Sequence, residues 1–425
     1  MNILIKNTAA LLPDGNKLKV DFADIYIKGD TIEAVNEIPE SFTADKVIDG
    51  SRFLTIPGLI NCHSHAYMSV FRNLADDLSF EEWLFGSISP REDKLTDEDA
   101  YWGSMLTCAE MIKTGTTCYM DMHMFRNMSA RAADRTGMRA VLTRGLVGSD
   151  RNDEGGIRRI NDTLEEMKQW KNNSRMSFML APHAIYTCGD DYLRFCIEKA
   201  KEYGLPFHTH LSETVNEVEN CKKAHNGMTP VEYLNDMGFF DIKTCAAHCV
   251  HVTENDMKIF KSKGVNVIHN PKSNLKLGNG IAPVYEMDKM GINVCMGTDS
   301  QASNNSNNLF SDINFAALLQ KTGNATAVGA QEVMKFATVN GAKALGLNTG
   351  VIESGRKADL ALLDLDRPEF YPRNNLLSAL AYSANGTETD TVIIDGQIVL
   401  EHGKLTLADE EEIYAKAQEV MDRLR

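Results

Sequence analysis

Eight short apolar segments with strand character recur through the middle of the chain, and segments with helical spacing separate them. A regular alternation of strand and helix over about 250 residues is typical of a parallel eight-stranded barrel surrounded by helices. The sequence therefore predicts an α/β protein whose main domain is a (β/α)8 TIM barrel. The predicted strands are residues 54–60, 116–122, 139–147, 176–182, 206–212, 244–250, 265–270 and 292–298.

Helix start signals lie between these strands. Thr96 precedes an acidic first turn and an apolar helical run that stops at Gly115. Thr253 is followed three residues later by Asp256, a spacing that lets the two side chains cap a helix reciprocally. Both signals support the alternation of strand and helix.

The two ends of the chain have a different pattern from the middle. Residues 1–55 read as short alternating strands with Gly, Asp and Asn turns, and residues 350–404 have the same character. We therefore expect a small β-sandwich domain built from both termini, residues 1–55 and 350–425, with the barrel of residues 56–349 inserted between its halves. From Leu405 onward the sequence predicts a polar helix.

Charge and cysteine usage narrow the class of partner. The formal net charge of the 425 residues is −15, and no run of Lys or Arg is long enough to follow a phosphate backbone. We expect a small-molecule partner, no nucleic acid and no membrane, and the sequence leaves a homo-oligomer open. The nine scattered cysteines contain no CxxC pair, and no signal peptide precedes the first strand, so we expect reduced thiols and a cytoplasmic protein.

Histidines and one aspartate follow several of the predicted barrel strands. His63 and His65 are two residues apart, so they project to the same face of a strand and can reach one ion. An HxH pair alone is a weak signal. However, His210, His248 and Asp299 come at the ends of the fifth, sixth and eighth predicted strands. Residues at these strand ends meet at one face of a barrel, so the sequence predicts a metal site there.

One divalent ion is expected rather than two. A two-metal site needs a bridging carboxylate at an intermediate strand end, and the fourth strand is followed by His183 instead. Zn²⁺ is the ion that we expect, and Fe²⁺ or Mn²⁺ would suit the same ligands. His208 shares a strand face with His210 and is a rival ligand, but the Glu three residues after His210 favours His210.

The motifs PGLINCHSH, HTHLSE, AAHCVHV and MGTDS together resemble the amidohydrolase superfamily. LADDLSFEEWLFGSISPRED and NPKSNLKLGNGIAPV are similar to its 5′-methylthioadenosine/S-adenosylhomocysteine deaminases, and the likeness covers nearly the whole chain. The resemblance implies that Glu213 protonates a ring nitrogen of the substrate and that His248 orients the attacking hydroxide. Asp299 would be a second catalytic carboxylate. The implied metal ligands are His63, His65, His210 and Asp299.

The resemblance also implies substrate contacts. Trp83 would lie against the nucleoside, Glu92 would bind the ribose hydroxyls, and His183 would bind the purine edge. Arg144 and Arg158 would bind an amino-acid carboxylate, because a guanidinium fits a carboxylate in two places. Each of these has a structural alternative: a buried helix residue for Trp83, a solvated charge for Glu92 and an exposed arginine pair for Arg158. Ser303, four residues after Asp299, is a candidate ligand contact.

The main hypothesis is a metal-dependent aminohydrolase. It would convert the 6-amino group of S-adenosylhomocysteine, 5′-methylthioadenosine or adenosine into the 6-oxo product and ammonia by means of a metal-bound hydroxide. A second hypothesis keeps the chemistry and changes the substrate to a free base or other heterocycle, such as guanine, 8-oxoguanine, a pterin or a triazine. A third is a metal-free binding protein on the same barrel. The preferred substrate, the ion and the oligomeric state do not follow from the sequence.

Overall fold

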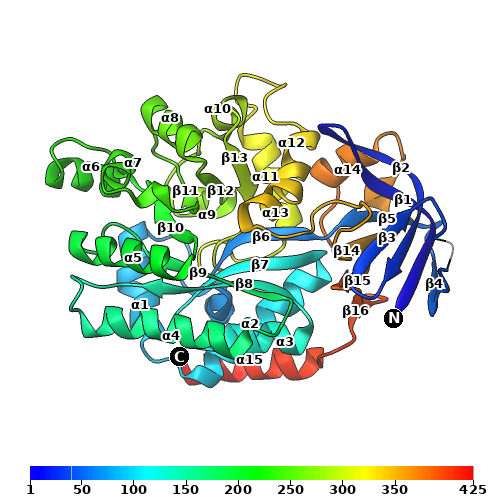
Figure 1. Cartoon of the computed structure of the whole chain (residues 1–425), viewed down its shortest axis with the longest axis horizontal. Helices are drawn as coiled ribbons and strands as arrows, with labels where there is room; N and C mark the ends of the chain where they lie inside the picture. The colour runs from blue at the N-terminus through cyan, green and yellow to red at the C-terminus, as the bar shows by residue number, and fades with distance from the viewer. Residues whose placement is uncertain (40, 425) are drawn as a thin grey trace.

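The computed structural model describes residues 1–39 and 41–424 of the chain. Eight parallel strands form one curved sheet in the order β13 to β6. The two edge strands of this sheet, β13 and β6, lie next to each other, and the main-chain N–H of Asp299 after β13 donates to the carbonyl of His63 in β6 at 2.9 Å. The predicted barrel is thereby confirmed (Figure 1). Its strands are β6 (Leu59–Ser64), β7 (Thr116–His123), β8 (Arg139–Leu146), β9 (Met176–Pro182), β10 (Phe207–Leu211), β11 (Thr244–His248), β12 (Asn266–His269) and β13 (Asn293–Met296).

The first predicted strand differs from the structure. Residues 54–60 belong to two strands, β5 (Phe53–Pro57) in a separate sheet and β6 in the barrel. The chain changes sheets at Gly58, where a Cβ atom would lie 2.1 Å from side-chain atoms of Thr117. Only glycine allows this close approach. The other seven predicted strands match β7 to β13 within two residues at each end.

Helices connect the barrel strands and cover them from outside (Figure 1). The capping of α2 by Thr96 and of α8 by Thr253 is confirmed, because each threonine side chain accepts from the third residue of its helix and the acidic side chain there accepts in return. The helices of the barrel region are α1 (Ser89–Glu92), α2 (Asp97–Lys113), α3 (Met128–Thr136), α4 (Glu154–Trp170), α5 (Asp190–Tyr203), α6 (Val215–Ala224), α7 (Pro230–Asp236), α8 (Glu254–Lys263), α9 (Pro271–Lys276), α10 (Val284–Lys289), α11 (Leu309–Leu319), α12 (Ala330–Phe336) and α13 (Val339–Leu345). Short irregular helices are η1 (Ala66–Phe71), the π-helix η2 (Glu82–Ile88) and η3 (Phe239–Asp241).

Strands from both termini build the separate sheet, as predicted. Its order is β17-β16-β15-β14-β5-β1-β2-β3, with β4 paired to β1, so the N-terminal β5 lies beside the C-terminal β14. Its buried core is aliphatic, with Ile3, Ile25 and Leu360 fully enclosed. The remaining strands are β1 (Asn2–Asp14), β2 (Lys17–Lys28), β3 (Thr31–Val35), β4 (Lys46–Asp49), β14 (Leu360–Asp364), β15 (Thr389–Ile394), β16 (Gln397–Glu401) and β17 (Lys404–Leu405).

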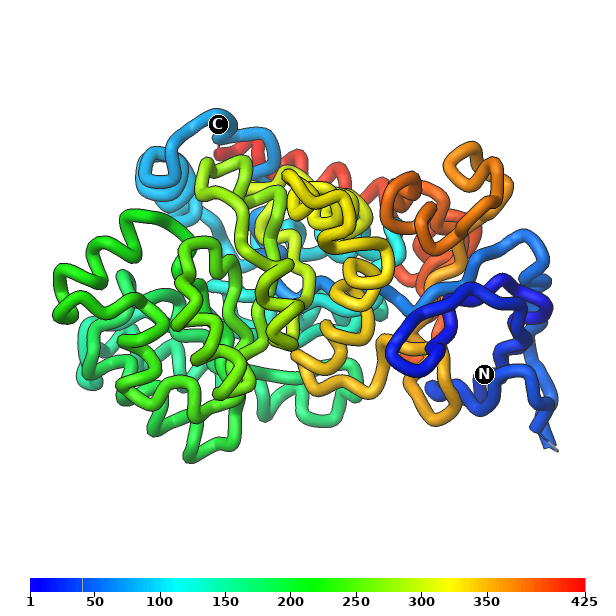
Figure 2. Tube along the Cα trace, turned by 90° about the horizontal axis from the view of Figure 1, so that it is seen from above, coloured from blue at the N-terminus to red at the C-terminus, as the bar shows by residue number. Residues whose placement is uncertain are grey.

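The chain returns to the barrel at its end. After η4 (Pro368–Phe370) and α14 (Leu376–Tyr382), the predicted C-terminal helix is present as α15 (Glu410–Leu424). It runs along α2, where Lys113 pairs with Glu410 at 2.7 Å and Arg423 pairs with Asp99. In Figure 2 the C-terminus therefore lies far from the N-terminus. The helix packs on the barrel rather than on the sheet of the termini.

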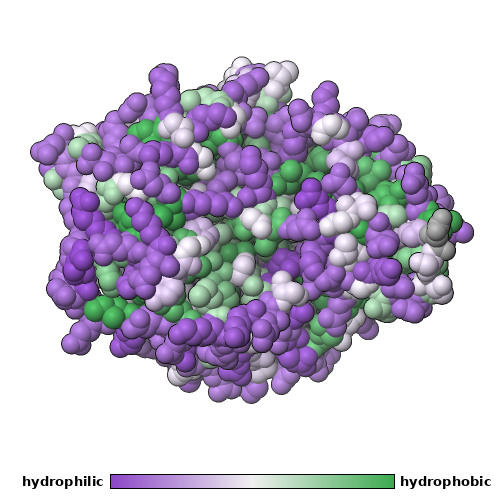
Figure 3. Space-filling view, in the orientation of Figure 1, coloured by the Kyte–Doolittle hydropathy of each residue, from purple (hydrophilic) through white to green (hydrophobic). Residues whose placement is uncertain are grey.

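The outer surface is mainly polar. The face drawn in Figure 3 is mainly hydrophilic, and hydrophobic residues appear there in separate patches. Within the described residues, no helix combines the length and the apolar character that a membrane crossing requires.

One buried histidine in the barrel gives a prediction for the pH dependence of stability. His269 ends β12, is fully enclosed, and has no hydrogen-bond partner for either ring nitrogen among the described residues. Burial lowers its pKa to about 3. In the unfolded chain the histidine has a pKa of about 6.5. Between about pH 3 and pH 6.5, His269 is therefore protonated in the unfolded chain but neutral in the folded chain. Stability must fall as the pH drops through this window.

We expect His269→Phe to reduce this loss of stability. From pH 7 to pH 5 the wild-type histidine costs about 2 kcal/mol of unfolding free energy, and the variant does not incur that cost. Urea unfolding at the two pH values measures the difference. Equal losses of stability in both proteins would contradict the expected neutral state of His269.

Candidate active site

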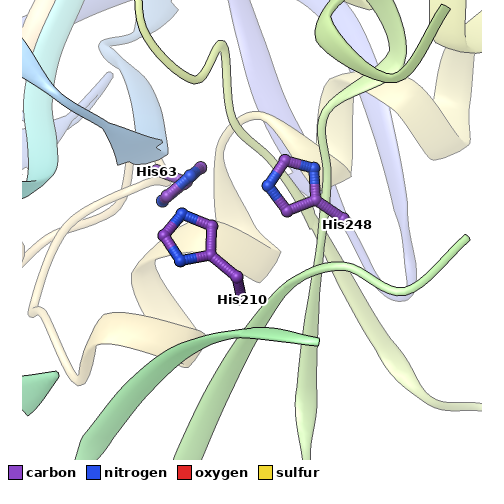
Figure 4. A group of neighbouring side chains, drawn as sticks. All are labelled: His63, His210 and His248. Atoms are coloured by element: carbon purple, nitrogen blue, oxygen red, sulfur yellow. The ribbon is translucent and has the colours of Figure 1, made fainter. Parts of the chain in front are cut away.

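The predicted histidines and Asp299 meet at the carboxyl ends of the barrel strands. His63 lies in β6 and His65 directly after it, while His210 and His248 lie in β10 and β11. Ligand nitrogens of His63, His210 and His248 lie within 4.8 Å of one another, and the same is true of ligand atoms of His63, His65 and Asp299. Figure 4 shows three of the rings turned toward one another. All five residues are at most 9% exposed.

Main-chain carbonyls orient two of these rings. Nδ1 of His65 lies 2.8 Å from the carbonyl oxygen of Met122, and Nδ1 of His210 lies 2.9 Å from that of His183. Because a carbonyl only accepts, both Nδ1 atoms carry the proton and both Nε2 atoms present a lone pair. The two Nε2 atoms are 3.3 Å apart. This is the arrangement that metal-binding histidines require.

Asp299 is held as an acceptor. The hydroxyls of Ser273 and Ser303 donate to its Oδ2 at 2.6 and 2.9 Å, while its Oδ1 lies 3.3 Å from Nε2 of His63. Ser303, predicted as a ligand contact, is thus directed at this carboxylate. The preceding Gly297 is required, because a Cβ there would lie 2.9 Å from that of His63.

Glu213 and His248 form the second part of the site. Burial raises the pKa of Glu213 well above its usual range, which favours the protonated form of its carboxyl. The Asn279 amide donates to Oε1 at 3.0 Å, which leaves the proton on Oε2, 3.7 Å from Nε2 of His248. Nδ1 of His248 donates to Oδ1 of Asn274 at 2.8 Å. A neutral acid therefore lies beside a basic nitrogen.

Sequence reasoning did not assign Ser273, Asn274 and Asn279 to the site. All three come from the NPKSNLKLGNG segment around α9, which the motif comparison had already singled out. The motif therefore indicated that the segment is functional, but the role of each residue in it depends on how the segment folds over the strand ends.

The structure places Trp83 and Glu92 in the segment above the barrel mouth. Trp83, in η2, is 7% exposed and its indole N–H donates to the carbonyl of Ala302 at 3.0 Å. Glu92 ends α1 and accepts a hydrogen bond from the Tyr67 hydroxyl. Burial raises the pKa of Glu92, and the hydrogen bond from Tyr67 opposes this rise.

Arg144 lies in β8 with unused hydrogen-bonding capacity. One guanidinium nitrogen pairs with Asp162 at 3.3 Å, and its Nε and Nη1 are buried without a hydrogen-bond partner among the described residues. The cost of leaving such donors unpaired indicates an additional acceptor in the working protein.

The neighbouring arginines of α4 differ in where they lie. Arg158 is exposed, whereas Arg159 is half-buried and donates to the carbonyl of Val147 at 3.3 Å. The charge of Arg159 acts on Glu92 and on His183, whose pKa burial lowers to about 3. The structure therefore brings Arg159, which the sequence reasoning missed, to the side of the site where Arg158 was expected.

His183 lies between His210 and Thr187, a residue that lines a surface groove. Its ring centroid lies 4.6 Å from that of His210, and its Nδ1 lies 3.0 Å from the Thr187 hydroxyl. One groove of about 420 Å³ is lined by Arg159 and Tyr186 among others, and a second of the same volume adjoins Tyr186 and Thr214, next to Glu213.

The donor set fits one divalent metal ion. It offers neutral imidazole nitrogens and one carboxylate, a combination that suits zinc, iron or manganese. Nε2 of His63 is buried and has no hydrogen-bond partner within residues 1–39 and 41–424, which a bound cation would supply.

Comparison with known proteins agrees with this geometry. Residues 54–399 match the model of the amidohydrolase family. The chain is 46% identical to a 5-methylthioadenosine/S-adenosylhomocysteine deaminase from Thermoanaerobacter pseudethanolicus, over 97% of both chains. It is also 46% identical to a 5′-deoxyadenosine deaminase from Methanocaldococcus jannaschii, over 95% of this chain and 96% of that one.

A solved structure gives the same result for the fold. The crystal structure of an adenosine deaminase from Xanthomonas campestris with bound zinc has a TM-score of 0.94 and 30% identity, and the match covers 100% of this chain and 98% of that one. The family match over residues 54–399 and the 46% identity to nearly full-length relatives indicate common descent and not only a shared fold. The chain therefore belongs to the amidohydrolase family, in the branch of the 5-methylthioadenosine/S-adenosylhomocysteine deaminases.

Proposed function

We propose that the chain is a metal-dependent aminohydrolase that removes the 6-amino group of S-adenosylhomocysteine, 5′-methylthioadenosine or a related adenosine derivative. The products are the 6-oxo nucleoside and ammonia. The observation that carries the proposal is the buried carboxyl of Glu213 beside His248 and the group of side chains that could hold a metal ion. The deaminase names of relatives at 46% identity support the choice of an adenosine derivative.

His63, His65, His210 and Asp299 would hold one divalent ion, which we propose is Zn²⁺. When bound, such an ion lowers the pKa of a water molecule to near neutral pH and supplies the nucleophile for C6. The ionised Asp299 accepts a proton from the attacking water and returns it to the departing amine. His248 accepts a hydrogen bond at Nε2 and so orients the water.

Glu213 supplies the proton that makes C6 electrophilic. Its Oε2 proton passes to the purine nitrogen beside C6, which allows that ring to accept the electron pair of the forming C–O bond. Oε1 stays bonded to the Asn279 amide throughout, so the carboxyl keeps its orientation. Ammonia departs with the proton that Asp299 returns, and the remaining proton of the C6 hydroxyl passes to Glu213, which yields the 6-oxo ring and regenerates the acid.

Other residues would bind the rest of the nucleoside. We propose Trp83 against the sugar and base, Glu92 on the ribose diol, and His183 on the purine edge. Arg144 and Arg159 would bind the carboxylate of S-adenosylhomocysteine, with Arg159 in place of the exposed Arg158 that the resemblance implied. The nine cysteines are all free and buried, which supports a reducing, cytoplasmic setting.

The direct test is ammonia release from a panel of S-adenosylhomocysteine, 5′-methylthioadenosine, adenosine, adenine, guanine and 8-oxoguanine by zinc-loaded protein. We expect turnover of the nucleosides and none of the free bases. Turnover of a free base alone would favour the second hypothesis, and inactivity toward the whole panel would overturn the deaminase proposal.

Arg159→Met should affect one substrate selectively. We expect kcat/KM for S-adenosylhomocysteine to fall by about 10- to 100-fold, because a charge-assisted hydrogen bond to its carboxylate contributes about 1.5–3 kcal/mol. The value for 5′-methylthioadenosine, which has no carboxylate, should change by less than about threefold. Arg158→Met, one residue away and exposed, is the matched control. Equal losses on both substrates would show that Arg159 has a structural role.

Glu92→Gln should weaken recognition of the ribose. We expect about a 10-fold or larger fall in kcat/KM for 5′-methylthioadenosine, and a much smaller fall for its 2′,3′-dideoxy analogue, because only the former offers hydroxyl donors. The exposed neighbour Asp93 provides the control Asp93→Asn. An unchanged value with the ribose substrate would mean that Glu92 does not bind the diol.

A further inference from the structure

His208 lies in β10 two residues before His210, and it is fully buried. Its Nε2 lies 2.8 Å from Nδ1 of His63, and its Nδ1 lies 3.0 Å from the carbonyl oxygen of Cys245. Both of its nitrogens are thus used inside the barrel wall. Among the described residues, the groups that could hold a metal ion do not include it. His208 is therefore a neighbour of a candidate ligand rather than a rival one.

The hydrogen bonds define where each proton lies. The carbonyl of Cys245 can only accept, so Nδ1 of His208 carries a proton. In a neutral ring this leaves Nε2 of His208 as an acceptor, and Nδ1 of His63 must then donate to it.

The opposite tautomer of His63 is unfavourable in this setting. It would place the lone pairs of two buried nitrogens against each other at 2.8 Å, and would point a proton from Nε2 into the metal donor set. The tautomer with the proton on Nδ1 instead leaves the Nε2 lone pair of His63 facing the site, 3.3 Å from Oδ1 of Asp299.

The hydrogen bond that orients the His63 ring differs from those of the other two histidines in the proposed ligand set. The Nδ1 atoms of His65 and His210 donate directly to main-chain carbonyls. His63 reaches the main chain only through the ring of His208. A single side chain thus determines the tautomer of this ligand, and it can be replaced without changing the backbone.

We propose that His208 is a positioning residue that sets the tautomer of His63 and thereby raises the affinity of the site for a divalent ion. The inference rests on the proposed metal site. Partners that orient a metal-binding histidine in this way commonly contribute 10- to 100-fold to metal affinity.

The first test measures zinc affinity by competition with a chromophoric chelator. We expect His208→Phe, which keeps a ring but removes the acceptor, to weaken zinc binding by about 10- to 100-fold. His208→Gln should stay within a few fold of wild type, because its amide oxygen can accept from His63 and its NH₂ can donate to Cys245. His269→Phe makes the same change in an equally buried ring outside this chain of hydrogen bonds and should bind zinc normally.

The second test reads the tautomer itself. In metal-free protein labelled with ¹⁵N-histidine, we expect Nδ1 of His63 to have the chemical shift of a protonated nitrogen in wild type and in His208→Gln. His208→Phe should show a mixture of both tautomers. A purely structural role would lower the thermal midpoint without moving these shifts.

The outcomes separate the inference from the proposed function. Stoichiometric zinc in wild type with equal affinity in His208→Phe would overturn the inference alone. An unchanged His63 tautomer in His208→Phe would do the same. Absence of zinc binding in wild type would overturn the proposed metal site, and with it the inference about affinity.

Discussion

Glu213→Gln is expected to lower kcat for deamination by about 10²- to 10⁴-fold, the range that general acid catalysis contributes. Gln keeps nearly the same shape and can still accept the hydrogen bond from Asn279 through its amide oxygen. It has no proton to deliver to the purine ring. The loss should therefore appear in kcat, while the zinc content and the affinity for the 6-oxo product remain close to wild type.

The pH profile provides a second readout for the same residue. Burial raises the pKa of Glu213, so the acid form persists above the usual pH range of a carboxyl group and is lost as the pH rises through that pKa. Wild-type kcat should fall on the alkaline side, and Glu213→Gln should lack this limb. Glu219→Gln, on the exposed side of α6 where Glu219 contacts Lys222, is the matched control. Activity of Glu213→Gln within tenfold of wild type would remove Glu213 from the mechanism.

Removal of the metal should have an effect of comparable size. Dialysis against a chelator is expected to reduce turnover by at least about 10³-fold, since a catalytic metal supplies several kcal/mol of transition-state stabilisation. One equivalent of Zn²⁺ should restore activity, and Fe²⁺ or Mn²⁺ can be compared with it in the same assay. Full activity of the chelated, metal-free protein would contradict the proposed mechanism.

His210→Asn separates loss of metal from loss of fold. The Asn amide nitrogen can replace Nδ1 in the hydrogen bond to the carbonyl of His183, but nothing replaces Nε2. We expect a folded protein that holds less than stoichiometric zinc and does not recover with added metal. His251→Asn tests the same substitution at a half-buried histidine outside the donor group. Normal zinc content in His210→Asn would exclude His210 as a ligand.

Sequence reasoning was sufficient for the barrel and for the convergence of its histidines. Strand ends of a parallel barrel all meet at one face, so the positions of His63, His210, His248 and Asp299 along the chain imply their closeness in space. No knowledge of loop conformation is needed for that step. The division of residues 54–60 between two sheets was not predicted, because it depends on how closely β6 approaches Thr117.

The substrate side of the site was less accessible to sequence reasoning. Arg158 and Arg159 differ by about 100° in direction on a helix, and the sequence does not tell which of them faces the barrel mouth. Similarly, Ser303 was near enough to Asp299 to suggest a role, but only the fold shows that its hydroxyl is directed at the carboxylate. Side-chain direction in loops and on helix surfaces depends on packing that spacing does not encode.

The closure of the barrel between its first and last strands has a consequence for biosynthesis. His63 emerges early from the ribosome, whereas Asp299, whose main-chain N–H bonds to the carbonyl of His63, is made more than two hundred residues later. The pairing of β5 with β14 can form only later, because β14 begins at Leu360. A nascent chain therefore carries its first histidines well before Asp299, and the group of side chains proposed to hold the metal is complete only once Asp299 has been made.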